Sequence, residues 1–203
     1  QKAKAASALF CDTVINGDSS TNAIAFDGLD VALTGSSTEF NTTTAIDLST
    51  SAQVTANYMQ FLDMLDEFLT ELDGQPSALL CNTKMCAKLR AVARRAGMYQ
   101  TSQDEWGRTV ESYGSIPFID LGAKPGTNDP IIATNSNETS IYAVRFGLDG
   151  FHGISMAGQP PVRMWLPDFS TYGAVKKGEV EMVAAVALKA TKAAGVFRKI
   201  KIS

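Results

Sequence analysis

The clearest pattern of apolar and polar positions along the chain is a helical one over residues 52–73. Apolar residues recur there at spacings of three and four, and acidic residues occupy the opposite side. The apolar positions are Val54, Tyr58, Phe61, Leu62, Leu65, Phe68, Leu69 and Leu72, and the acidic ones are Asp63, Asp66, Glu67, Glu71 and Asp73. Hydroxyl residues at 49–51 are candidate N-caps, and Gly74 and Pro76 follow the end. We therefore predict a helix with one face in the core and one acidic face.

Two further helices are predicted from composition and capping signals. Residues 2–14 are rich in good helix formers, and the Asn-Gly pair at 16–17 is a usual helix end. Residues 78–81 form a short apolar run typical of a buried strand. The asparagine that follows is a candidate N-cap for a helix over 82–96, which Gly97 would end. Residues 52–96 are thus predicted to form a helix, a strand and a second helix.

From Trp106 onward the pattern is that of β-strands. The segments WGRTVESY (106–113) and SIPFIDLG (115–122) flank Gly114, which predicts a hairpin. Further strands are predicted over 130–133, 140–147, 180–188 and 197–202, with a polar turn at 135–138. Residues 31–50 are rich in Thr, Ser and Asn, which predicts a loop with at most one short strand.

The order of these elements indicates an α+β fold. The helices lie in the first half and most strands in the second, without the regular alternation of a doubly wound parallel sheet. No repeat of fixed period is present, which excludes solenoids and propellers.

Composition and charge limit the range of functions. The chain has 203 residues, 45% of them hydrophobic, and a formal net charge of −3. Without an overall basic field, any contact with DNA would be local or weak. The predicted helix 82–96 carries a group of basic residues, interpreted either as a solvated rim or as a surface for a partner or phosphate. These residues are Lys84, Lys88, Arg90, Arg94 and Arg95.

The cysteines and the ends of the chain suggest an intracellular protein. Cys11, Cys81 and Cys86 are odd in number and lack ligand spacing, which argues against a disulfide framework and a zinc site. We expect Cys81 and Cys86 to be small core residues without a redox role, in a reducing compartment. No apolar run has the length of a membrane span, and no secretory leader is present. The chain begins at Gln1, so we expect a further segment to precede it.

No catalytic, cofactor-binding or metal-binding residue is assigned. His152 is the only histidine, and no serine or cysteine lies in a G-x-S-x-G context. Asp149 and His152 would supply only part of a metal site. The glycines at 147, 150 and 153 lack the helix that a phosphate-binding loop requires. An α+β enzyme or ligand-binding domain centred on His152 remains an alternative.

Two tight-turn signals enclose a short loop after the first helix. They are Val14-Ile15-Asn16-Gly17-Asp18 and Phe26-Asp27-Gly28-Leu29-Asp30. Such Asn-Gly, Gly-Asp and Asp-Gly pairs allow positive φ or turns capped by their own side chains. We expect Phe26 and Leu29 to pin the loop onto the subunit. The segment resembles the one that leaves the long spine helix in major capsid proteins of tailed phages, which have the Hong Kong 97 fold.

Three further stretches resemble the same family, in the same order along the chain. They are SALLCNTKMCAKLRAVARRAG, SIPFIDLG with PIIATNSNETSIYAVRFG, and VEMVAAVALKATKAAGVFRKI. The resemblance implies two interleaved domains. Residues 1–45, with the end of the spine helix, and 155–192, with a long sheet, would form the peripheral domain. Residues 46–154 and the closing strand 193–203 would form the axial domain.

The resemblance also implies a function. The chain would be a structural major capsid protein of a tailed phage or prophage, not an enzyme, and would need no cofactor. Its copies would form pentamers and hexamers of an icosahedral shell around double-stranded DNA. Scaffold, protease or portal proteins would be its other partners, and no membrane would be involved. It would assemble in the cytoplasm of the bacterial host and reside in the virion capsid.

The resemblance has one departure and one alternative. The N-terminal arm and extended loop that precede the spine helix in the family are absent, so we expect this chain alone to be monomeric or to form small rings. No crosslinking residue is transferred from the family. The alternative with the same fold is an encapsulin-like nanocompartment shell protein, which encloses protein cargo.

Overall fold

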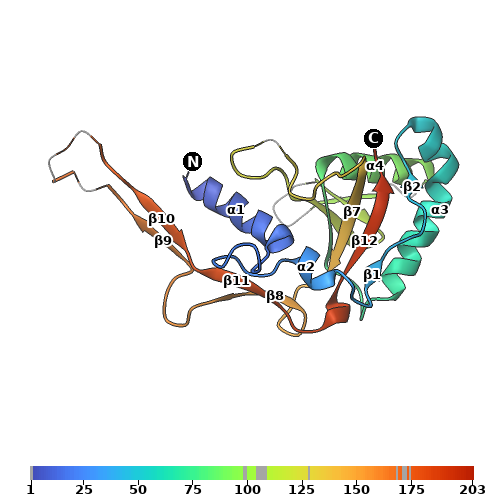
Figure 1. Ribbon diagram of the computed structural model, residues 1–203. Helices are drawn as coiled ribbons and strands as arrows, with labels where there is room; N and C mark the ends of the chain where they lie inside the picture. The colour runs from blue at the N-terminus through green and yellow to red at the C-terminus, as the bar shows by residue number, and fades with distance from the viewer. Residues whose placement is uncertain are drawn as a thin grey trace.

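The computed structural model describes residues 2–97, 100–103, 109–127, 129–167, 169–170, 173 and 175–203. Figure 1 shows a body of helices and strands from which a long β arm extends, with the first helix beside it. The helices are α1 (Lys2–Asn16), α2 (Leu29–Leu33), α3 (Ser51–Thr70) and α4 (Thr83–Arg95), with a 3-10 turn, η1 (Thr191–Ala193). The strands of the body are β1 (Glu39–Phe40), β2 (Ile46–Asp47), β3 (Ala78–Cys81), β4 (Gln100–Gln103), β5 (Thr109–Tyr113), β6 (Ile116–Asp120), β7 (Glu138–Val144) and β12 (Ala194–Lys201). The arm contains β8 (Phe151–Ser155), β9 (Val162–Trp165), β10 (Glu179–Met182) and β11 (Ala184–Leu188).

The body is built on one mixed sheet, which confirms the predicted α+β class. Within the described residues its strand order is β1-β12-β7-β3-β6-β5-β4, and β2 also pairs with β12. Strand β12 runs parallel to β1 and β2 and antiparallel to β7, while β3 runs parallel to β6. The last strand of the chain therefore lies between segments from the first quarter and from the middle of the sequence.

Both faces of this sheet are covered. On one face, α3 and α4 pack against alternate residues of the central strands, including Leu79, Ile141 and Phe197. On the other face, the end of α1, α2 and the segment at 131–132 pack against the intervening residues, such as Tyr142. The middle of each central strand is thus buried on both sides, which is why residues 78–81, 141–144 and 194–197 are apolar.

The helices form largely where the pattern predicts them. Helix α3 begins after Thr50, whose hydroxyl accepts a hydrogen bond from Gln53 N at 3.2 Å. Helix α4 begins after Asn82, whose side-chain oxygen accepts one from Met85 N at 2.7 Å. These side chains satisfy backbone donors that a first helical turn leaves free. Helix α1 extends to Asn16, as the Asn-Gly signal indicated.

The predicted hairpin is present, but some strands differ from the prediction. Strands β5 and β6 pair through Tyr113 and Ile116 around Gly114, which has φ +58°. Trp106, at the start of the predicted hairpin, lies outside the described residues. Strand β4, which pairs with β5, was not predicted. Residues 31–50 contain the end of α2 and the two-residue strands β1 and β2, so a helix was missed there.

Two strand predictions in the second half are wrong. Residues 130–133 form a bent segment whose one described strand-like pairing is a bridge from Pro130 to Ala123. Ile131 and Ile132 are nevertheless buried, which explains their apolar character. The predicted strand 180–188 is two strands that meet at Val183: β10 pairs with β9, and β11 with β8. The strands predicted over 140–147 and 197–202 are β7 and β12, which begin earlier than expected.

The interpretation of the cysteines needs a correction. Cys81 and Cys86 are buried in the core, as expected, but they form a disulfide. Cys81 ends β3 and Cys86 lies in the first turns of α4, so the strand-to-helix turn brings their Cα atoms to 6.2 Å. That separation is typical of disulfides. Sequence spacing gave no sign of it, because the proximity depends on the tertiary angle of the turn.

Gly195 provides a test of the packing of β12 against α3. A Cβ atom at this position would lie 2.8 Å from Leu72 Cδ2 and 2.9 Å from Phe68 Cε2. We expect Gly195→Ala to lower the free energy of unfolding by about 1–3 kcal/mol, since the core must shift to accept the methyl group. Urea unfolding would measure it.

Gly153→Ala is the matched control. This glycine is also in a strand, but its Cβ would meet only Ala185 O at 3.9 Å. We expect its effect to stay within about 0.5 kcal/mol. Equal effects of the two substitutions would contradict the packing argument.

Candidate functional site

The loop between α1 and α2 is closed by two glycines. Gly28 N donates a hydrogen bond to Gly17 O at 2.8 Å. A Cβ on Gly17 would lie 2.3 Å from Phe26 O, and one on Gly28 would lie 2.5 Å from Ile15 O. Neither glycine has a positive φ. The glycines are therefore required for close approach of two backbone segments, and not for the left-handed conformation that the sequence suggested as one option.

Asp18 and Asp27 fix the course of this loop. Asp18 accepts hydrogen bonds from Ser20 N at 2.8 Å, Ser20 Oγ at 2.6 Å and Thr21 Oγ1 at 2.6 Å. These bonds, first those of Ser20 and then those of Thr21, lower the pKa of Asp18 to about 2. Asp27 accepts from Ser19 N at 2.9 Å, and hydrogen bonding from Ser19 lowers its pKa too. The expected turn capped by its own side chains is confirmed.

Phe26 and Leu29 hold the loop against the subunit, as predicted. Leu29 is fully buried in the core on the α1 side of the sheet. Phe26 is half-buried, and its ring centroid lies 6.0 Å from that of Phe10 on α1. A groove of about 270 Å³ remains between α1, this loop and β10. We call it the α1 groove; its apolar lining includes Leu9, Phe10, Ile24, Phe26, Val180 and Met182.

The β9–β10 ribbon has one apolar and one polar face. In its antiparallel register, Val162 lies opposite Met182, and Met164 lies opposite Val180. Cross-strand partners share a face, so these four side chains form an apolar surface. The other face carries Arg163 opposite Glu181 and Trp165 opposite Glu179. Only the β10 half of the apolar face is next to α1, and Val162 and Met164 remain exposed.

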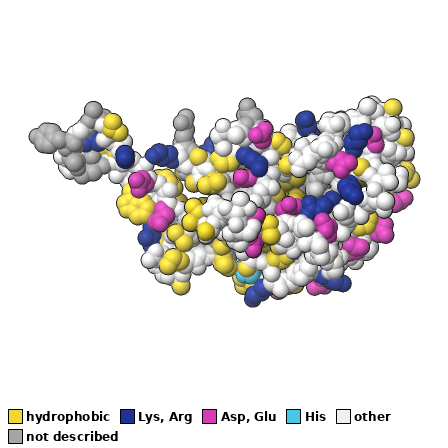
Figure 2. All heavy atoms as spheres, viewed as in Figure 1, with side chains coloured by type: hydrophobic (Ala, Val, Ile, Leu, Met, Phe, Trp, Pro, Cys, Tyr) yellow, Lys and Arg dark blue, Asp and Glu magenta, His cyan; other side chains and the backbone are white. Residues whose placement is uncertain are grey.

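Exposed apolar side chains are concentrated in the arm and its base. In the part of the chain that the structure describes, eleven of the sixteen large apolar side chains that are exposed lie within residues 146–183. Figure 2 shows apolar side chains gathered along the base of the arm, whereas charged side chains are interspersed over the body. Large exposed apolar patches on soluble proteins usually mark interaction surfaces. The arm is therefore the candidate functional surface.

The described residues do not bring Asp149 and His152 together in a metal cluster. His152 lies on β8 opposite Ala187, and its Nδ1 is buried without a hydrogen-bond partner. The carboxylate of Asp149 instead accepts a hydrogen bond from Arg145 at 3.0 Å. Gly150 allows the close approach of its backbone to Arg145 O, which a Cβ would meet at 2.6 Å. Among the described residues, no group of three His, Cys, Asp or Glu side chains could hold a metal ion.

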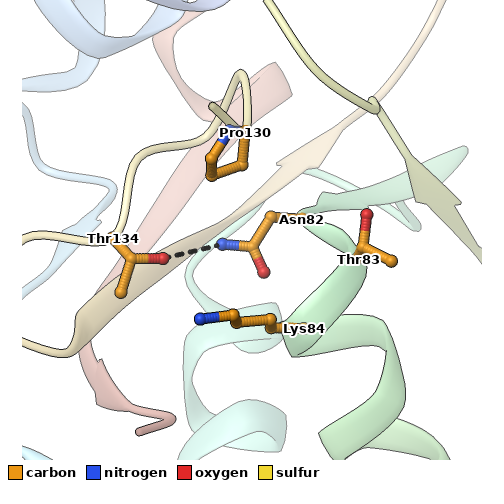
Figure 3. A pocket seen from close by; sticks show the side chains of 5 residues that line it. All are labelled: Asn82, Thr83, Lys84, Pro130 and Thr134. Atoms are coloured by element: carbon orange, nitrogen blue, oxygen red, sulfur yellow. Dashed lines mark hydrogen bonds between the residues drawn. The ribbon is translucent and has the colours of Figure 1, made fainter. Parts of the chain in front are cut away.

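A small pocket lies at the start of α4 (Figure 3). It is lined by Asn82, Thr83, Lys84, Pro130 and Thr134. The Asn82 amide already donates to Ile132 O at 3.2 Å and to Thr139 Oγ1 at 2.9 Å, while its oxygen caps α4. The Asn82 side chain therefore joins β3, α4 and the 131–134 segment. We interpret the pocket as part of this internal network.

Most of the basic residues of α4 have structural partners. Arg95 donates to Ser51 Oγ at 2.8 Å and to Thr55 Oγ1 at 3.0 Å, which joins α4 to α3. Lys88 donates to Ser49 O, and Arg90 forms an ion pair with Glu111. Lys84, Arg90 and Arg94 are exposed, as a solvated rim would be, whereas Lys88 and Arg95 are partly buried by their contacts. None of the helices in the described residues is both long and apolar enough to cross a membrane.

The pKa of Asp18 gives a test of the loop. Because its folded pKa lies below the ordinary 3.8, its stabilising contribution is complete above about pH 3.8 and is lost as the pH falls through about 2. We expect Ser20→Ala and Thr21→Val each to raise this pKa toward 3.8, and Thr21→Ser to leave it low. Carboxyl-carbon NMR titration would measure it. An unshifted pKa in the parent protein would contradict the hydrogen-bonded loop.

His152→Phe tests whether the histidine is needed for the fold. Replacing a buried nitrogen without a partner by an apolar ring should leave the free energy of unfolding unchanged or raise it by up to about 1 kcal/mol. Phe151→Ala, at a buried neighbouring position, should cost about 3–5 kcal/mol and shows that the unfolding assay is sensitive. A clear loss of stability in His152→Phe would mean that the imidazole has a partner.

Comparison with known proteins identifies a similar fold. No protein-family model and no curated protein matches the chain. Among solved structures, it is similar to the cryo-EM structure of the holo-SrpI encapsulin complex from Synechococcus elongatus, with a TM-score of 0.60 and 17% sequence identity. The match covers 87% of this chain and 57% of the encapsulin chain, so this chain spans little more than half of that protein. The fold is therefore an α+β fold similar to that of an encapsulin, which is of the Hong Kong 97 type.

Proposed function

We propose that this protein is a structural subunit that self-assembles into a closed protein shell. The observation that carries the proposal is the similarity of its fold, over 87% of the chain, to that of an encapsulin. Copies would meet in rings of five and six, through contacts repeated around each ring. Such a protein needs extended surfaces for its neighbours more than it needs an enclosed pocket.

The distribution of apolar surface supports this proposal. The arm exposes large side chains such as Leu166 and Phe169, which are 82% and 79% exposed. A two-stranded ribbon is only marginally stable on its own in water. Contact with another copy would cover these side chains and hold the ribbon. The side chains that would support an enzyme, Asp149 and His152, have no shared role in the structure.

The content of the shell distinguishes two versions of the proposal. We favour an encapsulin-like compartment around protein cargo, because the similar solved structure is an encapsulin complex. A tailed-phage or prophage capsid around DNA is the second candidate. The loop that Gly17 and Gly28 close lies in the segment that resembles phage capsid proteins. This resemblance favours the capsid. Scaffold, protease and portal partners, and residence in a virion, belong to this second version only.

The predicted domain division is part of this proposal. The axial domain would contain residues 46–154 and 193–203, and the peripheral domain residues 1–45 and 155–192. The pairing of β12 with β7 in one sheet supports the assignment of the last strand to the axial domain. The position of α1 along β10 supports its grouping with the arm. Strand β1 of the peripheral domain would join the axial sheet through its parallel pairing with β12.

Electron microscopy tests the proposed assembly. The protein in the form its gene encodes, purified from its own host, should form shells or rings. A protein that stays monomeric at high concentration would contradict the proposal. Nuclease-resistant DNA inside the particles, with portal, protease and terminase genes nearby, would identify a phage capsid. An enclosed protein, with a peroxidase or ferritin-like gene nearby, would identify an encapsulin.

A further inference from the structure

The Cys81–Cys86 disulfide joins a strand and a helix at one turn of the chain. Cys81 is the last residue of β3, and Cys86 lies in the first turns of α4. Both side chains belong to the core between the sheet and the helices α3 and α4, where the two residues are 0% and 4% exposed. The bond therefore fixes the start of α4 to the sheet, and the folded chain shields it from solvent.

The two ends of α4 are held by different contacts. Near its C-terminal end, Arg95 donates a hydrogen bond to Thr55 Oγ1 of α3 at 3.0 Å. At its N-terminal end, Asn82 accepts a hydrogen bond from Met85 N at 2.7 Å and donates one to Thr139 Oγ1 at 2.9 Å (Figure 3). The disulfide adds a covalent bond at this end. Its cleavage therefore weakens the attachment of the start of α4 and leaves the contacts of its end unchanged.

The thiol form of the pair fits the same backbone. Cys81 Sγ lies 3.8 Å from Ile119 O, within reach of a weak hydrogen bond from a thiol. Free cysteine is also among the most buried residue types, because it packs as a small apolar side chain. The two cysteines are only five positions apart, and a crosslink that closes a short loop stabilises the whole chain least. Both redox states are thus compatible with the fold, and the bond acts mainly on α4.

A reductant can reach the disulfide only after a local opening. Thiol–disulfide exchange requires a thiolate to attack a sulfur atom directly. The outer side of the first turns of α4, with Thr83, Lys84 and Ala87, is exposed, whereas Cys86 faces the core. Cys11 does not supply the thiolate in the folded chain, because it packs against the core on the other face of the sheet. An external thiolate therefore attacks when the first turns of α4 separate from β3.

We propose that Cys81 and Cys86 form a redox-sensitive lock on the start of α4. In the disulfide state the first turns are fixed to β3, and in the thiol state they open more often while the fold persists. The reductant is a dithiol, whose two thiols give up two electrons and two protons and become a disulfide. The Cys81–Cys86 bond takes up these electrons and protons and becomes two thiols. This lock goes beyond the proposed shell function and does not depend on it.

Hydrogen exchange of the full chain, followed by mass spectrometry, tests the lock. In a Cys11→Ser background, Cys81 and Cys86 are the only cysteines. Refolding in oxidised glutathione prepares the disulfide state, and dithiothreitol then prepares the thiol state. We expect reduction to speed the exchange of amides within 83–89 roughly tenfold or more, because the loss of a crosslink frees the segment that it held. The increase should be smaller in β7 and β12, which the bond does not cross.

Cys86→Ala in the same background is the matched control. It cannot form the bond, so its exchange should be the same with and without dithiothreitol. Alkylation of thiols with iodoacetamide gives a second, independent measurement on the parent. We expect dithiothreitol to reduce the folded protein roughly a hundredfold more slowly than the protein in concentrated urea, because reduction of the folded chain waits for local opening.

Each contrary result would overturn the lock. Two free thiols after refolding in oxidised glutathione would show that the bond does not form. Equal exchange in the two redox states, or an equal increase within 83–89 and in β7 and β12, would show that the bond does not act on the start of α4. Equally fast reduction of folded and unfolded protein would show that no opening is needed. Shell formation enters none of these measurements, so their failure leaves the proposed function standing.

Discussion

The position of β12 at the centre of the sheet is the constraint on which the rest of the fold depends. This strand, from the end of the chain, pairs with β1, β2 and β7. Phe197 lies fully buried, with its ring centroid 5.1 Å from that of Phe40 and 6.0 Å from that of Phe61. Without β12, the first quarter of the chain would lose its strand partner. The core on the α3 side would also lose its central ring.

The next residue of β12, Arg198, connects the sheet to α2 and β1. Arg198 donates to Asp30 at 2.8 Å and to Thr34 Oγ1 at 2.9 Å, and it forms an ion pair with Glu39. Tyr142 on β7 donates to the same Asp30 carboxylate at 2.8 Å. Burial, followed by the charge of Asp30, raises the pKa of the Tyr142 hydroxyl, so it stays a donor. This network fixes α2, and with it the end of the loop that leaves α1.

Helix α1 connects the core of the body to the arm. Its last turn enters the core through the buried Ile15, and Asn16 donates to Ile131 O at 2.8 Å. Its first turn contacts the arm through Lys2, which donates to Gly178 O. One helix thus relates the orientation of the arm to that of the body. In a shell subunit this would matter, because the angle between contacts decides whether a ring closes.

The sequence by itself determined the features that depend on neighbours in the chain. The period of α3, the Thr50 and Asn82 caps, the hairpin turn at Gly114 and the Asp18 turn all use groups within a few residues, and all were predicted. Tertiary structure decided the rest. The break between β10 and β11 depends on which strand each one pairs with, and the Cys81–Cys86 bond depends on the angle between β3 and α4. The apolar residues at 130–133 were predicted to be a strand because buried segments are apolar whether or not they pair with another strand. The exposed apolar arm could not be predicted for the same reason. Hydrophobicity shows that a side chain favours burial, and only the fold shows which apolar side chains stay exposed among the described residues.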